Sequence, residues 1–249
     1  MPSFSITWAE NDGRLDAQLL IQESGWLAGQ LKTLWQILVY LLPVVPVTIE
    51  LTLLSFGLAT LVGIFVGIAR ISHHPLIEKS SKIYVDVLRG VPLLVQIFFI
   101  YFGLGKVLHL SSFVAGVLAI GIGYSAYLAE TVRAGIQSIP KGQYEAALSL
   151  GMTRAQMMRY VILPQSLRLV VPPMANDFIA CLKDTSLVSV IGMRELTRAG
   201  REFYSQYFVD FQTWLVVGLL YLAMTLGLSR LVVWMEKKFK VHGLGERGA

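Results

Sequence analysis

Long apolar stretches alternate along the chain with shorter polar segments that are rich in Lys and Arg. An α-helix needs about 20 apolar residues to cross the ~30 Å hydrocarbon core of a bilayer, and five stretches approach or reach this length. The pattern therefore predicts an all-α membrane protein with about five transmembrane helices, at residues 47–69, 91–108, 113–129, 169–191 and 214–235.

A shorter apolar piece at residues 34–45 precedes the first stretch and is interrupted by Pro43. It is too short to span a bilayer, so we expect it to lie in the membrane interface. The chain then divides into three parts, which are an extracytoplasmic or interfacial amino-terminal segment (1–46), a transmembrane domain (47–236) and a basic cytoplasmic tail (237–249).

Composition and charge agree with a membrane protein. Only 15% of the residues are charged, whereas soluble domains carry about a quarter. The net charge of +5 does not indicate a nucleic-acid partner, because Lys and Arg collect in the cytoplasmic loops of membrane proteins. The five-helix arrangement places fourteen Lys and Arg on one side and six on the other. This asymmetry predicts an external amino terminus and a cytoplasmic carboxyl terminus.

The longest polar segment, residues 133–168, reads as two short helices joined by a turn. Pro140 suits the first turn of a helix, and Gly151 can adopt the left-handed conformation that ends one. Thr153 and Gln156 have the spacing of a capping box for a second helix, which we expect Pro164 to limit. Because such short helices are marginal in water, the segment must dock on a partner or on the chain's own helix ends.

Residues in this loop carry a resemblance to a known family. Its motif is EAA, three residues, Gly, nine residues, Ile, one residue and Leu-Pro. The chain resembles this "EAA" loop of ABC importer permeases over residues 138–165 and departs from it only where valine replaces isoleucine; the matching residues are Glu145, Ala146, Ala147, Gly151, Val161, Leu163 and Pro164. The segments LRGVPLLVQIFFIYFGL, YLAETVRAGIQSIPKGQ and LKDTSLVSVIG are similar to the polar amino acid branch of that family.

The resemblance, which covers about residues 47–236, implies a type I importer of the bacterial inner membrane. It implies two permease chains, two cytoplasmic ATPases and an extracytoplasmic amino acid-binding protein. The seven residues of the EAA loop would form a coupling helix that docks on an ATPase. The chain itself contains no G-x-x-x-x-G-K-[ST] run, so we expect it to be no enzyme and to hold no cofactor, with ATP and Mg²⁺ on the partner ATPase.

A second pattern lies in the first apolar stretch, where small residues recur every four positions at Ser55, Ala59, Gly63 and Gly67. Such a stripe lets two membrane helices pack closely. The partner is either another helix of the same chain, which we favour, or a second permease chain.

Polar residues interrupt the fourth stretch, where a charged side chain costs roughly 2.5–3.5 kcal/mol on insertion scales. They must face a partner or a water-filled path, so we predict that a substrate pathway is lined by Asn176, Lys183, Asp184, Thr185 and Ser186, with Gln96 of the second stretch. The alternative is that these residues pair within the bundle and only fix its packing. Glu130 and Arg133 have the spacing of an intrahelical ion pair.

The interpretation that we favour is a permease that forms the pathway of an ATP-driven amino acid importer. A gradient-driven transporter or channel is the alternative, but the chain lacks two similarly interrupted spans in inverted halves. A membrane scaffold would leave the charges of the fourth stretch unexplained. No metal site is expected, because His73 and His74 are adjacent and cannot share a helix face. Which amino acid is carried, and whether the second permease is identical, stay open.

Overall fold

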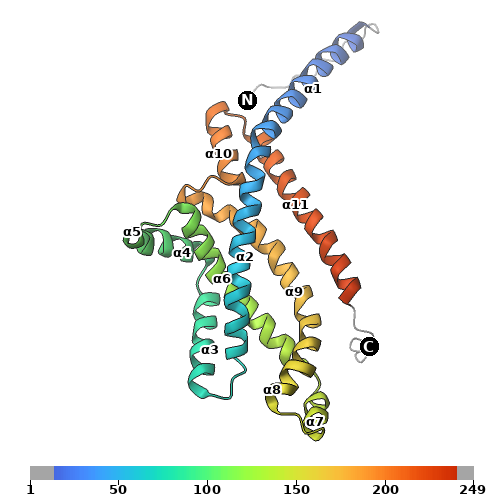
Figure 1. Cartoon of the computed structure of the whole chain (residues 1–249). Coiled ribbons are helices and arrows are strands. Elements are labelled where there is room, and N and C mark those ends of the chain that lie inside the picture. Colours follow the sequence, from blue (N-terminus) through green and yellow to red (C-terminus); the bar gives the residue numbers. More distant parts are fainter. Residues whose placement is uncertain (1–13, 240–249) are drawn as a thin grey trace.

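Helices form all the regular structure in residues 14–239, for which the computed structural model describes the backbone; side chains are described for residues 28–234. This confirms the all-α prediction for that part of the chain. The longer helices run side by side, with α7 and α8 at one end and α10 toward the other (Figure 1). The α-helices are α1 (Arg14–Leu41), α2 (Val45–Ala69), α3 (Pro75–Gly90), α4 (Leu93–Phe98), α5 (Gly105–Leu108), α6 (Ser112–Gln137), α7 (Lys141–Ser149), α8 (Arg154–Met157), α9 (Leu163–Asp184), α10 (Leu196–Tyr207) and α11 (Asp210–Phe239).

Four short segments of other helical types connect these helices. The 3₁₀ segments are η1 (Leu42–Val44) and η4 (Thr185–Ile191), and the π-helical segments are η2 (Phe99–Leu104) and η3 (Met158–Ile162). Because η1 joins α1 to α2, helical structure is continuous over Ala28–Ala69, which is 42 residues. At 1.5 Å per residue this stretch is about 63 Å long, twice the thickness of the hydrocarbon core.

Residues 34–45, which we predict to lie in the membrane interface, are not a separate segment but part of one continuous helical stretch. They continue into α2 and pack against α10 and α11 in a cluster that includes Ile37, Leu41 and Phe203. Pro43 and Pro46 do not break the helix, because each lies in the first turn of its segment, where the amide hydrogen that proline lacks has no helical partner.

By length and apolarity, the described residues contain three helices that could cross a membrane and one bent pair, fewer than the five predicted. The three are Ala28–Ala69, Ser112–Gln137 and Asp210–Trp234. The predicted second span is one arm of the bent pair, in which Pro75–Gly90 and Leu93–Leu108 meet at 102°. The bend lies at Gly90 and Pro92 because proline removes a helical hydrogen bond and disfavours helix at the residue before it.

Helix α9 occupies the place of the predicted fourth span and packs between α6 and α11. Its 22 residues are enough to cross a membrane, but its polar residues make it less apolar than the three candidate spans. It begins earlier than predicted, since Pro164 lies in its first turn and does not end a preceding helix. Helical structure therefore runs from the loop through η3 directly into α9.

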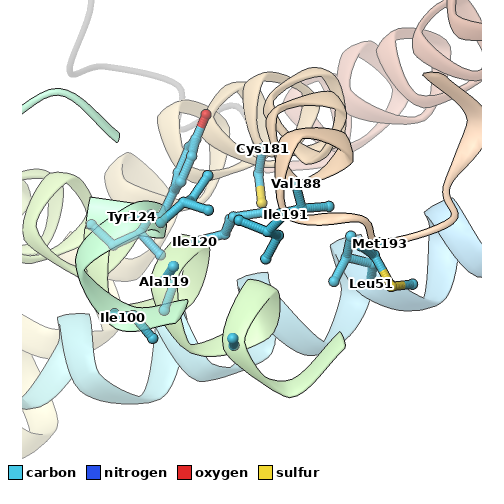
Figure 2. Packing of buried hydrophobic residues seen from close by; sticks show 13 residues of the cluster. Leu51, Ile100, Ala119, Ile120, Tyr124, Cys181, Val188, Ile191 and Met193 are labelled. Atoms are coloured by element: carbon cyan, nitrogen blue, oxygen red, sulfur yellow. The ribbon is translucent and has the colours of Figure 1, made fainter. Parts of the chain in front are cut away.

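The tightest packing joins α2 to α6 and involves the small residues of the first stretch. Ser55, Ala59, Gly63 and Gly67 are all buried, and a Cβ on Gly63 would lie 2.7 Å from the Cβ of Leu128. This confirms that the stripe packs inside the chain. On the α10 side the same core takes in Leu51, Ile120 and the η4 residues Val188 and Ile191 (Figure 2).

Candidate functional site

The loop after α6 forms a compact hairpin of α7 and α8. Gly151 has φ +77°, the left-handed conformation that the sequence predicts for it. Thr153 and Gln156 form the predicted capping box at the start of α8. The hydroxyl of Tyr144 donates to the carbonyl of Ile136 at 3.0 Å, which ties α7 to the end of α6. The hairpin therefore has a fixed position on the bundle.

The seven motif residues run from the hairpin into η3 and the start of α9 and divide into two groups. Glu145, Ala146, Gly151 and Pro164 are exposed and free to meet a partner. Ala147 is buried, and Val161 and Leu163 are half-buried, because all three pack in the chain's own cluster around Ile136 and Ile162. Some motif residues thus pack on the chain's own helix ends, whereas others are exposed.

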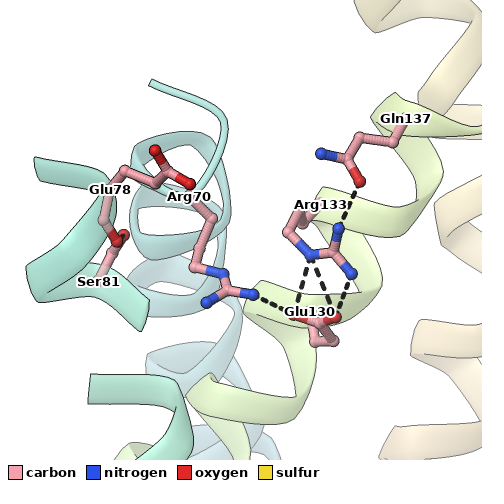
Figure 3. A network of polar contacts seen from close by, with 6 residues as sticks. All are labelled: Arg70, Glu78, Ser81, Glu130, Arg133 and Gln137. Carbon is pink, nitrogen blue, oxygen red and sulfur yellow. Dashed lines mark hydrogen bonds and ion pairs between the residues drawn. The ribbon is translucent and has the colours of Figure 1, made fainter. Parts of the chain in front are cut away.

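An ion network fixes the α6 side of this end (Figure 3). Glu130 accepts from Nε of Arg133 at 3.0 and 3.1 Å, as the spacing of the two residues predicts. Arg70, at the end of α2, adds a bond from Nη2 to Glu130 at 3.3 Å that the sequence did not indicate. Arg133 also bonds Gln137. One carboxylate thus holds two guanidinium groups from two helices.

A second site lies between α4, α6 and α9, where a cavity of about 280 Å³ is lined by Gln96, Tyr124, Asp177 and Asp184. The hydroxyl of Tyr124 donates to Oδ2 of Asp184 at 2.7 Å, and that of Thr131 donates to Oδ2 of Asp177 at 3.5 Å. The other oxygen of each carboxylate has no hydrogen bond within the described chain. The cavity therefore offers hydrogen-bond acceptors.

Gln96 belongs to both the bend and the cavity. Its Nε2 donates to the carbonyls of Leu88 and Val91 at 2.8 and 2.9 Å, which the break between α3 and α4 leaves without helical partners. Its Oε1 is buried and has no partner within the described residues. Gly123 makes room for it, since a Cβ there would lie 3.0 Å from that oxygen.

The structure divides the other predicted pathway residues. Asn176 and Lys183 are exposed and seven residues apart, so they share one face of α9. Thr185 is buried and donates to the carbonyl of Leu182 at 2.7 Å, which is a packing role. Ser186 is half-buried and does not line the cavity. The six predicted residues thus divide into two of the cavity wall (Gln96 and Asp184), two of an exposed stripe (Asn176 and Lys183) and two outside both (Thr185 and Ser186).

Tyr124 and Gly123 were not predicted, because a tyrosine and a glycine in an apolar helix carry no signal that distinguishes them from core residues. The described residues contain no group of three or more His, Cys, Asp or Glu that could hold a metal ion. The acceptors of Asp177, Asp184 and Gln96 in the cavity match a hydrogen-bonding cation.

Comparison with known proteins decides the family. Residues 59–241 match the family model of the binding-protein-dependent transport system inner membrane component. The chain belongs to this family. Among relatives, it is 36% identical over 211 residues to the glutamine transport system permease protein GlnP of Escherichia coli, covering 84% of this chain and 96% of that protein. It is also 36% identical over 194 residues to a probable glutamine ABC transporter permease protein, GlnM, of Bacillus subtilis, covering 78% and 90%.

Solved structures agree with the family. An amino acid ABC transporter crystallised with histidines is 40% identical and has a TM-score of 0.76, covering 80% of this chain and 94% of that one. The MetNI methionine ABC transporter in an inward-facing form has a TM-score of 0.72 at 18% identity, covering 81% and 97%, and so shares the fold. This chain is accordingly an inner-membrane transport component with the permease fold.

Proposed function

We propose that this permease is the membrane-spanning subunit of an ATP-driven amino acid importer in a bacterial cytoplasmic membrane. The cavity between α4, α6 and α9, whose polar lining comes from three helices, is the observation that carries the proposal. The relatives GlnP, a glutamine transport permease, and GlnM, a probable one, support amino acids as the substrate class. The amino terminus is external in this proposal, because the predicted Lys and Arg asymmetry places the hairpin end in the cytoplasm.

The hairpin of α7 and α8 is the proposed docking site for an ABC ATPase. Glu145, Ala146 and Leu150 are exposed at its outer surface, and Leu150 is 80% exposed. Small and apolar side chains there allow a groove on the partner to approach closely. Since η3 joins α8 to α9 without a break, a push on the hairpin is transmitted directly to the helix that carries Asp177 and Asp184.

The cavity is the proposed binding site for the amino acid on its way through the membrane. A substrate ammonium group can donate hydrogen bonds to Asp177, Asp184 and Oε1 of Gln96 together, and every free acceptor then gains a partner. Transfer of these carboxylates into the hydrocarbon region is costly unless they are paired. The external binding protein would deliver the substrate from the α10 end.

A second permease chain is also part of the proposal. Asn176 and Lys183 are exposed on α9, and polar side chains at membrane depth face protein or water and not lipid. A second chain that covers this face of α9 would enclose a water-filled path between the two copies. This exposed face of α9 calls for a covering chain. An identical chain and a related chain would both meet that need.

Two experiments test the proposal. A carboxyl-terminal tag on the chain should recover, from its native membrane in mild detergent, an ATPase bearing a P-loop in stoichiometric amounts by mass spectrometry. Recovery of the chain without any ATPase, even after crosslinking, would favour a gradient-driven transporter. In reconstituted vesicles, Asp184→Asn should lower amino acid uptake at least tenfold without reducing the recovered ATPase, because it removes one charge from the cavity while keeping its shape. Unchanged uptake would rule out the cavity as the site.

A further inference from the structure

A large open groove separates the α2–α3 corner from the hairpin of α7 and α8. Its volume is about 910 Å³, and residues from α2, α3, α6, α7 and the α8 region line it. Phe65, Ile68 and Ile77 form its apolar side, and all three are exposed. None of the substrate or docking contacts proposed above uses this groove.

The polar side of the groove is basic. Arg154 and Arg70 both line it, and Nε of Arg70 is buried without a partner in the described chain. The carboxylate of Glu130 accepts a hydrogen bond from Nη2 of Arg70 and also accepts one from Nε of Arg133. Glu78 is the acidic side chain in the lining. The surrounding segments 70–90 and 133–168 carry nine Lys and Arg against three Asp and Glu, so the local potential favours an anion.

The apolar side of the groove continues along the membrane-spanning part of the chain. Phe65, which is 68% exposed, and Ile68 lie in the stretch Ala28–Ala69 that is long and apolar enough to span. A soluble ATPase cannot reach this part of α2 inside a bilayer. An occupant that fits both sides must join an anionic group to long apolar chains.

We propose that this groove binds an anionic phospholipid. Its phosphodiester lies at the exposed guanidinium group of Arg154, the largely buried Arg70 adds positive charge behind it, and its acyl chains lie along Phe65, Ile68 and Ile77. Basic pockets near helix ends bind acidic lipid headgroups in this way. Because the groove ends at Tyr144 and Leu148 of α7, a bound lipid would brace the hairpin against the bundle.

The test compares two lipids with the purified chain, together with whatever partners it retains, in detergent. The thermal midpoint is measured while phosphatidylglycerol or phosphatidylcholine is added, without ATP. Wild-type protein should be stabilised at lower concentrations of phosphatidylglycerol. Arg154→Gln should need about fivefold more phosphatidylglycerol, which corresponds to the ~1 kcal/mol that one basic residue contributes near an acidic surface, and Arg154→Lys should retain most of the response.

Arg159→Gln is the matched control, because Arg159 is an exposed cation one turn further on that does not line the groove. Its response should equal that of the wild type. Equal responses to the two lipids, or equal losses in both glutamine variants, would overturn the proposal. The proposal would also be overturned if Arg154→Gln retained less ATPase but responded to lipid as the wild type does. The groove would then be a contact for the ATPase. None of these readings depends on transport.

Discussion

Glu195 has a fully buried carboxyl group that accepts hydrogen bonds from neutral donors. It caps the amino terminus of α10, where its oxygens accept from the backbone amides of Thr197 and Arg198, both at 2.8 Å. The hydroxyl of Tyr221 on α11 donates to it at 2.8 Å. The helix amino terminus adds partial positive charge. The residue therefore fastens α10 to α11 at the end opposite the hairpin.

Burial raises the pKa of the Glu195 carboxyl above its ordinary value. The folded state thus keeps its proton to a higher pH than the unfolded state, so the stability from this group is full below the unfolded pKa and is lost as pH rises through the folded pKa. Glu195→Gln removes the titration. We therefore compare the thermal midpoints of the wild type and the variant. The difference, wild type minus variant, should fall as the pH rises from about 4.3 toward neutral. A difference that is constant or that increases with pH would contradict this.

Single residues show where sequence reasoning succeeds and where it stops. The pair of Glu130 and Arg133 was predictable because helix geometry brings residues three apart together. Arg70 joins the same carboxylate from 60 positions away, and only the packing of α2 on α6 places it there. The role of Gln96 at the bend was also hidden. The two carbonyls to which it donates lack helical hydrogen bonds only because the chain bends by 102°.

Between elements, the α2–α6 contact is limited by backbone approach. Gly63→Leu should lower the free energy of unfolding by about 1–3 kcal/mol, the range for overpacking a dense contact, because even a Cβ there would lie 2.7 Å from that of Leu128. Gly57→Leu on the same helix is the control, since a Cβ there meets nothing within 4 Å. Thermal midpoints in detergent measure both. Equal effects would show that the substitution acts on the helix itself and not on the contact.

The hairpin turn makes a separate prediction. Gly151 has φ +77°, a conformation that costs other residues about 1–2 kcal/mol. Gly151→Val should therefore shift the hairpin and reduce both the retained ATPase and substrate-stimulated ATP hydrolysis, while the amount of inserted chain stays the same. Gly142→Val, which places the same side chain where a Cβ would be in open space, provides the comparison. If substrate stimulates ATP hydrolysis in Gly151→Val as strongly as in the wild type, the hairpin does not couple the permease to the ATPase.

At the level of elements, apolarity predicted which segments are helical better than it predicted how they cross. The α6 and α11 stretches were correctly located, as was the helical hairpin. The continuity of residues 34–45 with α2 was not predicted, because prolines in a first turn look in sequence like prolines that break a helix. The pairing of α3 with the predicted second span was missed, because α3 carries Lys79, Lys82 and Arg89, which an apolarity pattern assigns to a loop.

At the scale of the whole molecule, one face of α9 stays exposed and calls for a covering chain. Sequence predicted that the charges of the fourth stretch need a partner, and the structure divides them between a cavity in this chain and a face of α9 that the chain leaves open. No sequence pattern could make this division, because it depends on how α9 is rotated against α6 and α11. The open face is where the second permease chain is proposed.

A photo-crosslinker tests that arrangement directly. In a Cys181→Ala background, which removes the chain's lone cysteine, Asn176→Cys carrying a benzophenone maleimide should crosslink to another permease chain in native membranes. Mass spectrometry of the adduct should identify the covering chain as identical or related. Leu61→Cys is the control, since Leu61 is 58% exposed on the membrane-spanning part of α2 and should give lipid adducts. Lipid adducts from position 176 would mean that its polar stripe faces the bilayer, against the cost of polar groups there, and the proposed path between two chains would be wrong.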